Sequence, residues 1–109
     1  MLADLGAVAV VHCEDEGLIQ SIARGLTPDD IAQMRTLALA RPDLCEQRAI
    51  SHVGRLAAQT GCATHIVHVS SALGLAAVRE AKEAGATLTA ETCPQYLVLT
   101  SDSYDRMDG

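Results

Sequence analysis

The chain alternates between short apolar runs and longer segments in which apolar residues recur with a helical period. The apolar runs cover residues 7–12, 63–69 and 86–91. The first of them, AVAVVH, is rich in valine and continuously apolar up to its final histidine. A short run of this kind, without regular polar alternation, is typical of a strand that is buried on both faces of a sheet. We therefore expect a strand at each of the three runs.

The segments between the strands predict amphipathic helices, because their apolar residues recur every three to four positions. Local signals mark the helix ends: Thr27 precedes a proline at a first helical position, Gly61 follows a helix, and the pair Ser70 and Ser71 can cap the next one. The expected helices cover residues 16–24, 28–38, 43–59 and the segment between Ser71 and Gly85, with a turn at 93–96, a short helix at 101–107 and the last turn of a helix at 1–6.

The order strand, helices, strand, helix, strand indicates the α/β class, with a parallel βαβαβ segment built of right-handed crossovers. A length of 109 residues allows at most one ordinary domain, so residues 1–109 form a single unit. The composition is unusual for an independent domain, because Phe and Trp are absent and Ala, Val, Leu and Ile supply most of the apolar residues. We take this as a first sign that the chain is part of something larger.

Charge and cysteine content exclude several classes of protein. A net charge of −6 argues against nucleic-acid binding and against a membrane-surface protein. No apolar run is long enough to span a bilayer, and no basic segment typical of a secretory signal follows Met1. The four cysteines form no CxxC pair, which predicts reduced thiols rather than a structural zinc site. We therefore expect a cytoplasmic protein.

The histidines offer the main candidate chemistry. His12 and His68 stand at the C-terminal ends of predicted parallel strands, where α/β folds place their active sites. An imidazole there can bind a metal or act as a general base, and spacing alone leaves open whether the two share a metal ion or form hydrogen bonds at a sheet edge. His65 and His68 point to opposite faces of a regular strand, so we expect His65 to face the helical layer or the strand's start. His52 is expected to point outward from a helix or to be half-buried.

The acidic and hydroxyl residues near these strand ends carry weaker signals. Glu14, Asp15 and Glu16 are expected to be solvated loop carboxylates. Glu91 closes the third strand, and two roles stay open for it: orienting a histidine, or accepting hydrogen bonds from loop amides. A serine nucleophile would need a neighbouring base that this sequence does not display.

Four motifs, in this order and spacing, resemble the cyclic amidohydrolases, the family of hydantoinases or dihydropyrimidinases, allantoinases and dihydroorotases. The motifs are VHCED at 11–15, ARP at 40–42 with Glu46, HIVHVSS at 65–71 and TAETCPQYL at 89–97. Together they cover essentially the whole chain. The resemblance implies that residues 1–109 are a partial domain equivalent to strands 5 to 7 of a TIM-type (β/α)8 barrel, a fold that needs about 250 residues.

The resemblance also implies a reaction. Members of this family hold a two-zinc centre at the C-terminal face of the barrel, where a metal-bridging hydroxide attacks the carbonyl of a cyclic amide. His12 matches the ligand from strand 5, and His68 matches the ligand from strand 6. The chain has no His-x-His, no lysine before His12 and no aspartate that matches strand 8, so no further catalytic residue is expected in it. We expect weak zinc binding and no hydrolysis by the isolated chain.

The substrate branch is less specific than the family. The resemblance implies a small cyclic amide or ureide as substrate, and a homo-oligomer for the full-length protein. The motif at 91–97 is most similar to the hydantoinase and dihydropyrimidinase branch, which we therefore expect. The alternative is an allantoinase, to which HCE at 12–14 is closer, or a dihydroorotase. Two hypotheses of other classes are a non-catalytic relative that keeps the barrel for assembly and an independent α/β binding module. Retention of both His12 and His68 favours the enzyme over the first, and open sheet edges argue against the second.

Overall fold

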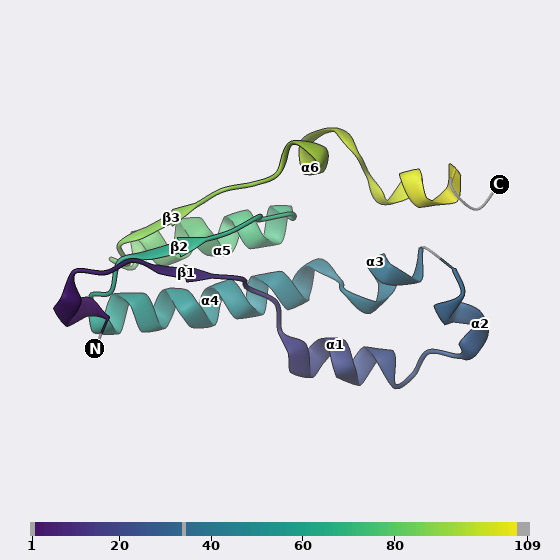
Figure 1. The fold of residues 1–109 in the computed structure, drawn as a ribbon, viewed down its shortest axis with the longest axis horizontal. Coiled ribbons are helices and arrows are strands. Elements are labelled where there is room, and N and C mark those ends of the chain that lie inside the picture. The colour runs from purple at the N-terminus through teal and green to yellow at the C-terminus, as the bar shows by residue number, and fades with distance from the viewer. Residues whose placement is uncertain (1, 34, 107–109) are drawn as a thin grey trace.

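A computed structural model describes residues 2–33 and 35–106, and at its centre is a three-stranded parallel sheet (Figure 1). The strands are β1 (Ala9–Val11), β2 (Thr64–Ile66) and β3 (Leu88–Ala90), in the order β1-β2-β3. Both pairings are parallel, and their registers bring Val10, His65 and Thr89 into one row across the sheet. The prediction of an α/β chain with a parallel sheet is therefore confirmed.

The helices connect the strands in the predicted order. The connection from β1 to β2 holds α1 (Glu16–Ala23), α2 (Pro28–Ile31), α3 (Thr36–Ala40) and α4 (Asp43–Thr60), and α5 (Ala72–Glu83) connects β2 to β3. After β3 come α6 (Pro94–Val98) and a 3-10 helix, η2 (Ser101–Arg106); another 3-10 helix, η1 (Ala3–Leu5), precedes β1. Figure 1 shows α4 and α5 running alongside the strands, with α1, α2 and α3 beyond one end of the sheet.

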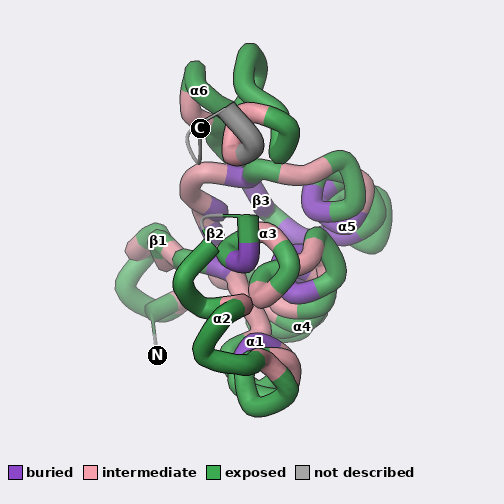
Figure 2. Tube along the Cα trace, turned by 90° about the vertical axis from the view of Figure 1, so that its right-hand side faces the viewer, coloured by how far each residue is buried: buried purple, intermediate pink, exposed green. Residues whose placement is uncertain are grey.

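The helices α4 and α5 cover one face of the sheet and form the core with it. The side chains with almost no exposure are Ile50, Ile66 and Cys45. Alanines fill much of the remaining core, among them Ala57, Ala77, Ala81 and Ala86. Figure 2 shows the buried positions concentrated on these two helices and the strands. Small side chains let helices pack closely on a sheet, which explains how a chain without Phe or Trp still forms a core.

The opposite face of the sheet is open over the part of the chain that the structure describes. Val10 is 67% exposed, and Thr89, at the other end of the same register row, is also exposed. Their neighbours Thr64 and Ile66 alternate with His65 and point toward the helices, with exposures of 4% and 0%. The strand period of two therefore separates a helix-covered face from a face that carries Val10, His65 and Thr89.

The expected helix over 28–38 is wrong in its extent, because the chain forms two short helices there. Helix α2 starts with a capping box, in which Thr27 and Asp30 exchange hydrogen bonds, and it ends at Ile31. The Thr36 hydroxyl then donates to the carbonyl oxygen of Asp30. Such a local side-chain bond competes with the regular helical ladder, so the helical period of the sequence is interrupted before α3.

Other elements differ from expectation mainly in length. Each strand has three residues, shorter than the apolar run that predicted it. The expected turn at 93–96 lies at the start of α6, which begins with a proline. The expected helix at 101–107 is the 3-10 helix η2 over residues 101–106, and position 107 lies outside the described residues. The predicted final helical turn at 1–6 contains η1, which ends at Leu5 and is capped by Gly6 in the left-handed conformation; position 1 lies outside the described residues.

The chain is more extended than a globular domain of its size. Its radius of gyration is 16.0 Å and its principal extents are 51 × 30 × 22 Å, whereas a compact domain of this length has a radius of gyration of about 13 Å. Figure 1 shows the reason: the segments α1–α3 and α6–η2 reach beyond the strands along the long axis. Among the described helices, none combines the length and the apolar character needed to cross a bilayer.

The four free cysteines differ in burial, so we expect two of them to react faster with thiol reagents than the other two. Burial raises the pKa of the Cys13 thiol to about 11, with a further contribution from the charge of Glu46, and burial also raises the pKa of Cys45. Because the thiolate is the reactive form, Cys62 and Cys93, which are partly exposed, should react with an aromatic disulfide reagent at pH 8 well before the other two. Mass spectrometry of quenched samples locates the modified thiols, and uniform reactivity would contradict this packing.

Candidate metal centre

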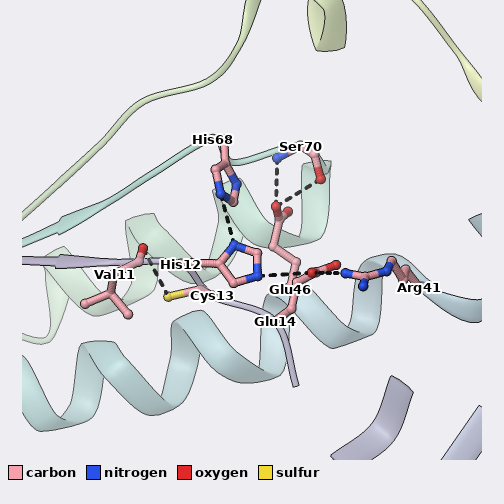
Figure 3. A network of polar contacts seen from close by, with 8 residues as sticks. All are labelled: Val11, His12, Cys13, Glu14, Arg41, Glu46, His68 and Ser70. Atoms are coloured by element: carbon pink, nitrogen blue, oxygen red, sulfur yellow. Dashed lines mark hydrogen bonds and ion pairs between the residues drawn. The ribbon is translucent and has the colours of Figure 1, made fainter. Parts of the chain in front are cut away.

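The C-terminal ends of β1 and β2 bring His12 and His68 together. His12 follows the last residue of β1, and His68 lies two residues beyond the end of β2. Nδ1 of His12 is 2.9 Å from Nε2 of His68, and the ring centroids are 4.8 Å apart at a tilt of 56°. Figure 3 shows the two imidazoles facing one another, although 56 residues separate them in the chain.

An unusual backbone conformation turns His68 toward His12. Regular strand alternation after β2 would point residue 68 to the same side as Ile66, toward the helices. His68 instead has a φ of 45°, and it is the one non-glycine residue with a positive φ among those described. This left-handed conformation costs a non-glycine residue about 1–3 kcal/mol. The conformation re-aims the ring, so that the two histidines meet on one side of the sheet.

His65 lies on the open face of the sheet, which corrects the expectation that it faces the helical layer or the strand's start. It stands in the open-face row between Val10 and Thr89, with Nδ1 at 2.8 Å from Oγ1 of Thr89. Its Nε2 lies 3.4 Å from Oε2 of Glu91. Of the two roles left open for Glu91, the structure shows contact with a histidine. That histidine is His65, outside the pair formed by His12 and His68.

Glu14 contacts the candidate site, which corrects the expectation of a merely solvated carboxylate. Its Oε2 lies 3.2 Å from Nε2 of His12, and the Arg41 guanidinium donates to the same oxygen (Figure 3). A carboxylate can only accept, so a neutral His12 that pairs with Glu14 carries its proton on Nε2 and turns the lone pair of Nδ1 toward His68. The tautomer of His12 therefore leaves an acceptor nitrogen facing the second imidazole.

Asp15, also expected in solvent, has a structural role. Its Oδ1 accepts from the backbone N–H of Leu18 at 3.0 Å and caps α1, and its Oδ2 lies 3.1 Å from Nε of Arg48. The cap holds the start of α1, and the ion pair connects the segment after β1 to α4. His52, on the same helix, is exposed, as expected.

The paired nitrogens fit two positions of a metal coordination sphere. Tetrahedral zinc with Zn–N bonds of about 2.0–2.1 Å requires two ligand nitrogens about 3.3 Å apart, close to the observed 2.9 Å. Within residues 2–33 and 35–106, no group of three or more His, Cys, Asp or Glu side chains could hold a metal ion. The Cys13 side chain is 3% exposed, and its thiol lies 4.0 Å from the carbonyl oxygen of Val11. Two imidazoles are thus what this part of the chain supplies.

Glu46 is the prominent site residue that the sequence analysis did not single out for a role. It lies on α4 with an exposure of 8%, and its carboxylate accepts hydrogen bonds from Ser70 and Ser71, directly after His68. It also lines a pocket of about 390 Å³ with both histidines, Arg41 and Tyr96. A signal was present: Glu46 is four residues before Ile50, so it stands in the apolar stripe of its helix.

Comparisons with known proteins align this chain with relatives that are named as enzymes. No family model matches the chain. An allantoinase of Rubrobacter xylanophilus is 39% identical over 105 residues, and an allantoinase of Solibacter usitatus is 36% identical; each alignment covers 96% of this chain and 23% of the relative. The chain therefore spans about a quarter of the length of these relatives.

Solved structures with the same local fold are also several times longer than this chain. A D-hydantoinase superposes with a TM-score of 0.89 at 29% identity, over 95% of this chain and 23% of its own. The dihydropyrimidinase from Brevibacillus agri gives a TM-score of 0.85 at 31% identity, over 92% and 22%. The L-hydantoinase from Arthrobacter aurescens gives 0.84 at 30%, over 97% and 24%. The likeness extends over nearly all of the present chain.

Proposed function

Because the chain belongs to the cyclic amidohydrolase family, which includes allantoinases and hydantoinases, we propose that it supplies part of a metal-dependent hydrolase of cyclic amides. The observation that carries the proposal is the approach of Nδ1 of His12 to Nε2 of His68, at 2.9 Å. When bound, a pair of divalent cations supplies a hydroxide nucleophile at neutral pH and polarises the amide carbonyl, so that a ring C–N bond is hydrolysed. The residues of this chain act by holding one of these cations.

The three strands correspond, in this proposal, to strands 5 to 7 of a TIM-type barrel, and residues 1–109 form a partial barrel domain. The superposition on hydantoinases supports this assignment. So does the sheet itself, since its open face would line the barrel interior and its helix-covered face would lie outside. The histidines stand at the C-terminal ends of the strands, the end of such barrels that carries active sites.

Each polar residue at the site has a distinct role in the proposal. His12 and His68 bind the cation through Nδ1 and Nε2, the atoms that face each other. Glu14 accepts a hydrogen bond from the Nε2–H of His12 and orients its ring, and Arg41 holds Glu14 in place. A carboxylate behind a ligating histidine fixes its tautomer and raises its basicity. The ion pair with Arg41 also holds the Glu14 carboxylate next to the His12 imidazole.

Allantoin ring opening is the more specific form of the proposal. The two allantoinases described above are 39% and 36% identical to this chain, whereas the D-hydantoinase and the Brevibacillus agri dihydropyrimidinase are 29% and 31% identical. The motif at 91–97 favours the hydantoinase branch, so hydantoin and dihydropyrimidine rings remain the alternative substrates. A non-catalytic assembly role is disfavoured, because such a role gives no reason for two imidazoles to converge.

Cobalt(II) titration of the chain and two alanine variants tests the metal site. We expect weak binding by the parent chain and at least a roughly ten-fold loss of affinity in His12→Ala and in His68→Ala, because each removes one of two ligands. His52→Ala removes an exposed histidine from α4 and serves as the matched control, with unchanged affinity. Equal affinities for the parent chain and both variants would refute the assignment of these ligands.

The isolated chain is expected to show no ring opening of allantoin, hydantoin or dihydrouracil, even with saturating zinc or cobalt. Two imidazoles leave a tetrahedral ion about two ligands short, and solvent filling those positions does not fix a second cation or a substrate. Chromatographic detection of the ring-opened products, after long incubation at high chain concentration, is the measurement. A metal-dependent turnover that His68→Ala abolishes would overturn this expectation and show that the chain assembles a working site.

A further inference from the structure

We propose that Glu46 is a positioning residue for His68: it fixes the two serines that follow His68 and thereby holds the imidazole toward His12. The inference deepens the proposed function, on which it depends only for the part that concerns metal binding. It assigns a role to a buried carboxylate whose hydrogen bonds go to Ser70 and Ser71.

Four donors surround the Glu46 carboxylate. Oε1 accepts from the backbone N–H of Ser70 at 2.8 Å and from its hydroxyl at 3.0 Å. Oε2 accepts from the backbone N–H of Ser71 at 3.0 Å and from the Ser71 hydroxyl. Figure 3 shows the Glu46 side chain rising from α4 to reach Ser70, next to His68. A buried carboxylate satisfied in this way is held firmly, because the loss of any donor leaves a buried charge under-solvated.

The N-terminus of α5 is shaped to admit this carboxylate. A Cβ on Gly74 would lie 2.1 Å from Oε2 of Glu46, so any side chain there would displace it. The helix does not need Glu46 for its cap, because the Ser71 hydroxyl already accepts from the Gly74 N–H at 2.9 Å. The four bonds to Glu46 therefore do something beyond capping: they tie the backbone at 70–71 to α4.

The segment that carries His68 is held on both sides. Upstream, the Val67 N–H donates to the carbonyl of Val11 at 3.2 Å, and downstream the Val69 N–H donates to the carbonyl of Glu91 at 2.8 Å. His68 lies between these two anchors in its left-handed conformation. Such a conformation persists only where the surroundings determine it. The Thr92 hydroxyl also donates to the carbonyl of Val69 at 2.6 Å, and Glu46 adds an anchor from helix α4.

A merely structural clamp would behave differently in solution. If Glu46 only joins α4 to α5, its replacement lowers the thermal stability, and His68 still meets His12 in the molecules that stay folded. If Glu46 positions His68, the contact between the imidazoles is lost in the folded molecules. The measurement must therefore report on the two rings and not on the fold alone.

The first experiment uses the metal-free chain. A nuclear Overhauser cross-peak between ring protons of His12 and His68 is expected in the parent chain, because the centroids are 4.8 Å apart. Glu46→Gln should abolish it, since an amide cannot accept on both sides. Glu80→Gln, an exposed change on α5, and Ile50→Val, which lowers the melting temperature from within α4, should both retain it. A cross-peak that persists in folded Glu46→Gln, or is absent from the parent chain, overturns the proposal.

The second experiment uses cobalt(II) and a double-mutant cycle. Glu46→Gln should lower the cobalt affinity roughly ten-fold, the loss typical of an outer partner of a ligating histidine. In a His68→Ala background the same change should have no effect, because the role of Glu46 passes through His68. Equal losses in both backgrounds overturn the proposal. If the parent chain binds no cobalt but Glu46→Gln abolishes the cross-peak, the metal function fails and the positioning role stands.

Ser70→Ala keeps the experiment informative if Glu46→Gln does not fold. This variant removes the hydroxyl donor to Oε1 but retains both backbone donors and the Ser71 cap of α5. We expect a weaker cross-peak and a smaller loss of cobalt affinity than in Glu46→Gln. A Ser70→Ala chain that matches the parent in both measurements, together with an unfolded Glu46→Gln, indicates a structural clamp and counts against positioning.

Discussion

An Ile50→Ala variant loses about 2–5 kcal/mol of unfolding free energy, the range found when a fully buried aliphatic side chain is truncated to alanine. Ile50 has 0% exposure and packs in the cluster that joins α4 to the sheet. Since folded domains have only about 5–15 kcal/mol of net stability, this single change removes a large share of it. Urea unfolding followed by far-ultraviolet circular dichroism measures the effect.

The control for Ile50→Ala is the same substitution at Ile31. That side chain is 67% exposed on α2, so its truncation should change the unfolding free energy by less than about 0.5 kcal/mol, as is usual for surface positions. Similar losses at both positions would mean that α4 is not packed on the sheet as described. The pair of variants tests the core without touching either histidine.

Gly54→Ala is the second large expected loss, in spite of the preference of helices for alanine. Intrinsic propensity alone would favour alanine by about 1 kcal/mol in the middle of a helix. The new Cβ, however, would lie 2.5 Å from Cβ of Ala81 on α5, an impossible contact between two short side chains. Overpacking of this kind costs about 1–3 kcal/mol or more. We therefore expect a net loss of stability, measured by the same urea titration.

A compensating change separates steric overlap from a general effect on α4. In the double variant Gly54→Ala with Ala81→Gly, the atom that clashes is gone, and the new Cβ meets the Cα of residue 81 at an ordinary 3.7 Å. The double variant should be more stable than the sum of the two single losses predicts. Strict additivity would show that α4 and α5 do not meet at this point. Gly54→Ala alone matching the parent chain would lead to the same conclusion.

Much of the fold could be predicted because its signals are local. The apolar runs identified the strands, and the ends of α4 and α5 follow from residues within a turn of them: Gly61 is left-handed at the C-terminus of α4, and Ser71 caps α5. The helix predicted over 28–38 failed for a related reason. Its periodicity was read as continuous, while a bond from the Thr36 hydroxyl to Asp30 interrupts the helical ladder there.

Part of the candidate site was also predictable. His12 and His68 follow the two parallel strands, and the C-terminal ends of parallel neighbours lie at one edge of a sheet. The position of His65 on the open face was not predicted. The alternation of side chains along a strand determines which residues share a face, but not which face the helices cover. The alternation argument also could not show the left-handed backbone that turns His68 toward His12.

The sequence by itself determined the class of fold, the order of the elements and the pair of histidines, since each depends on periodicity or on position relative to a strand end. Only the tertiary structure decided which side chains serve those histidines. Arg41 reaches Glu14 across 27 positions of the chain, and Glu46 reaches Ser70 across 24. Contacts at such separations depend on how α4 lies against the sheet, and that packing is a collective result of the whole core rather than of any local pattern.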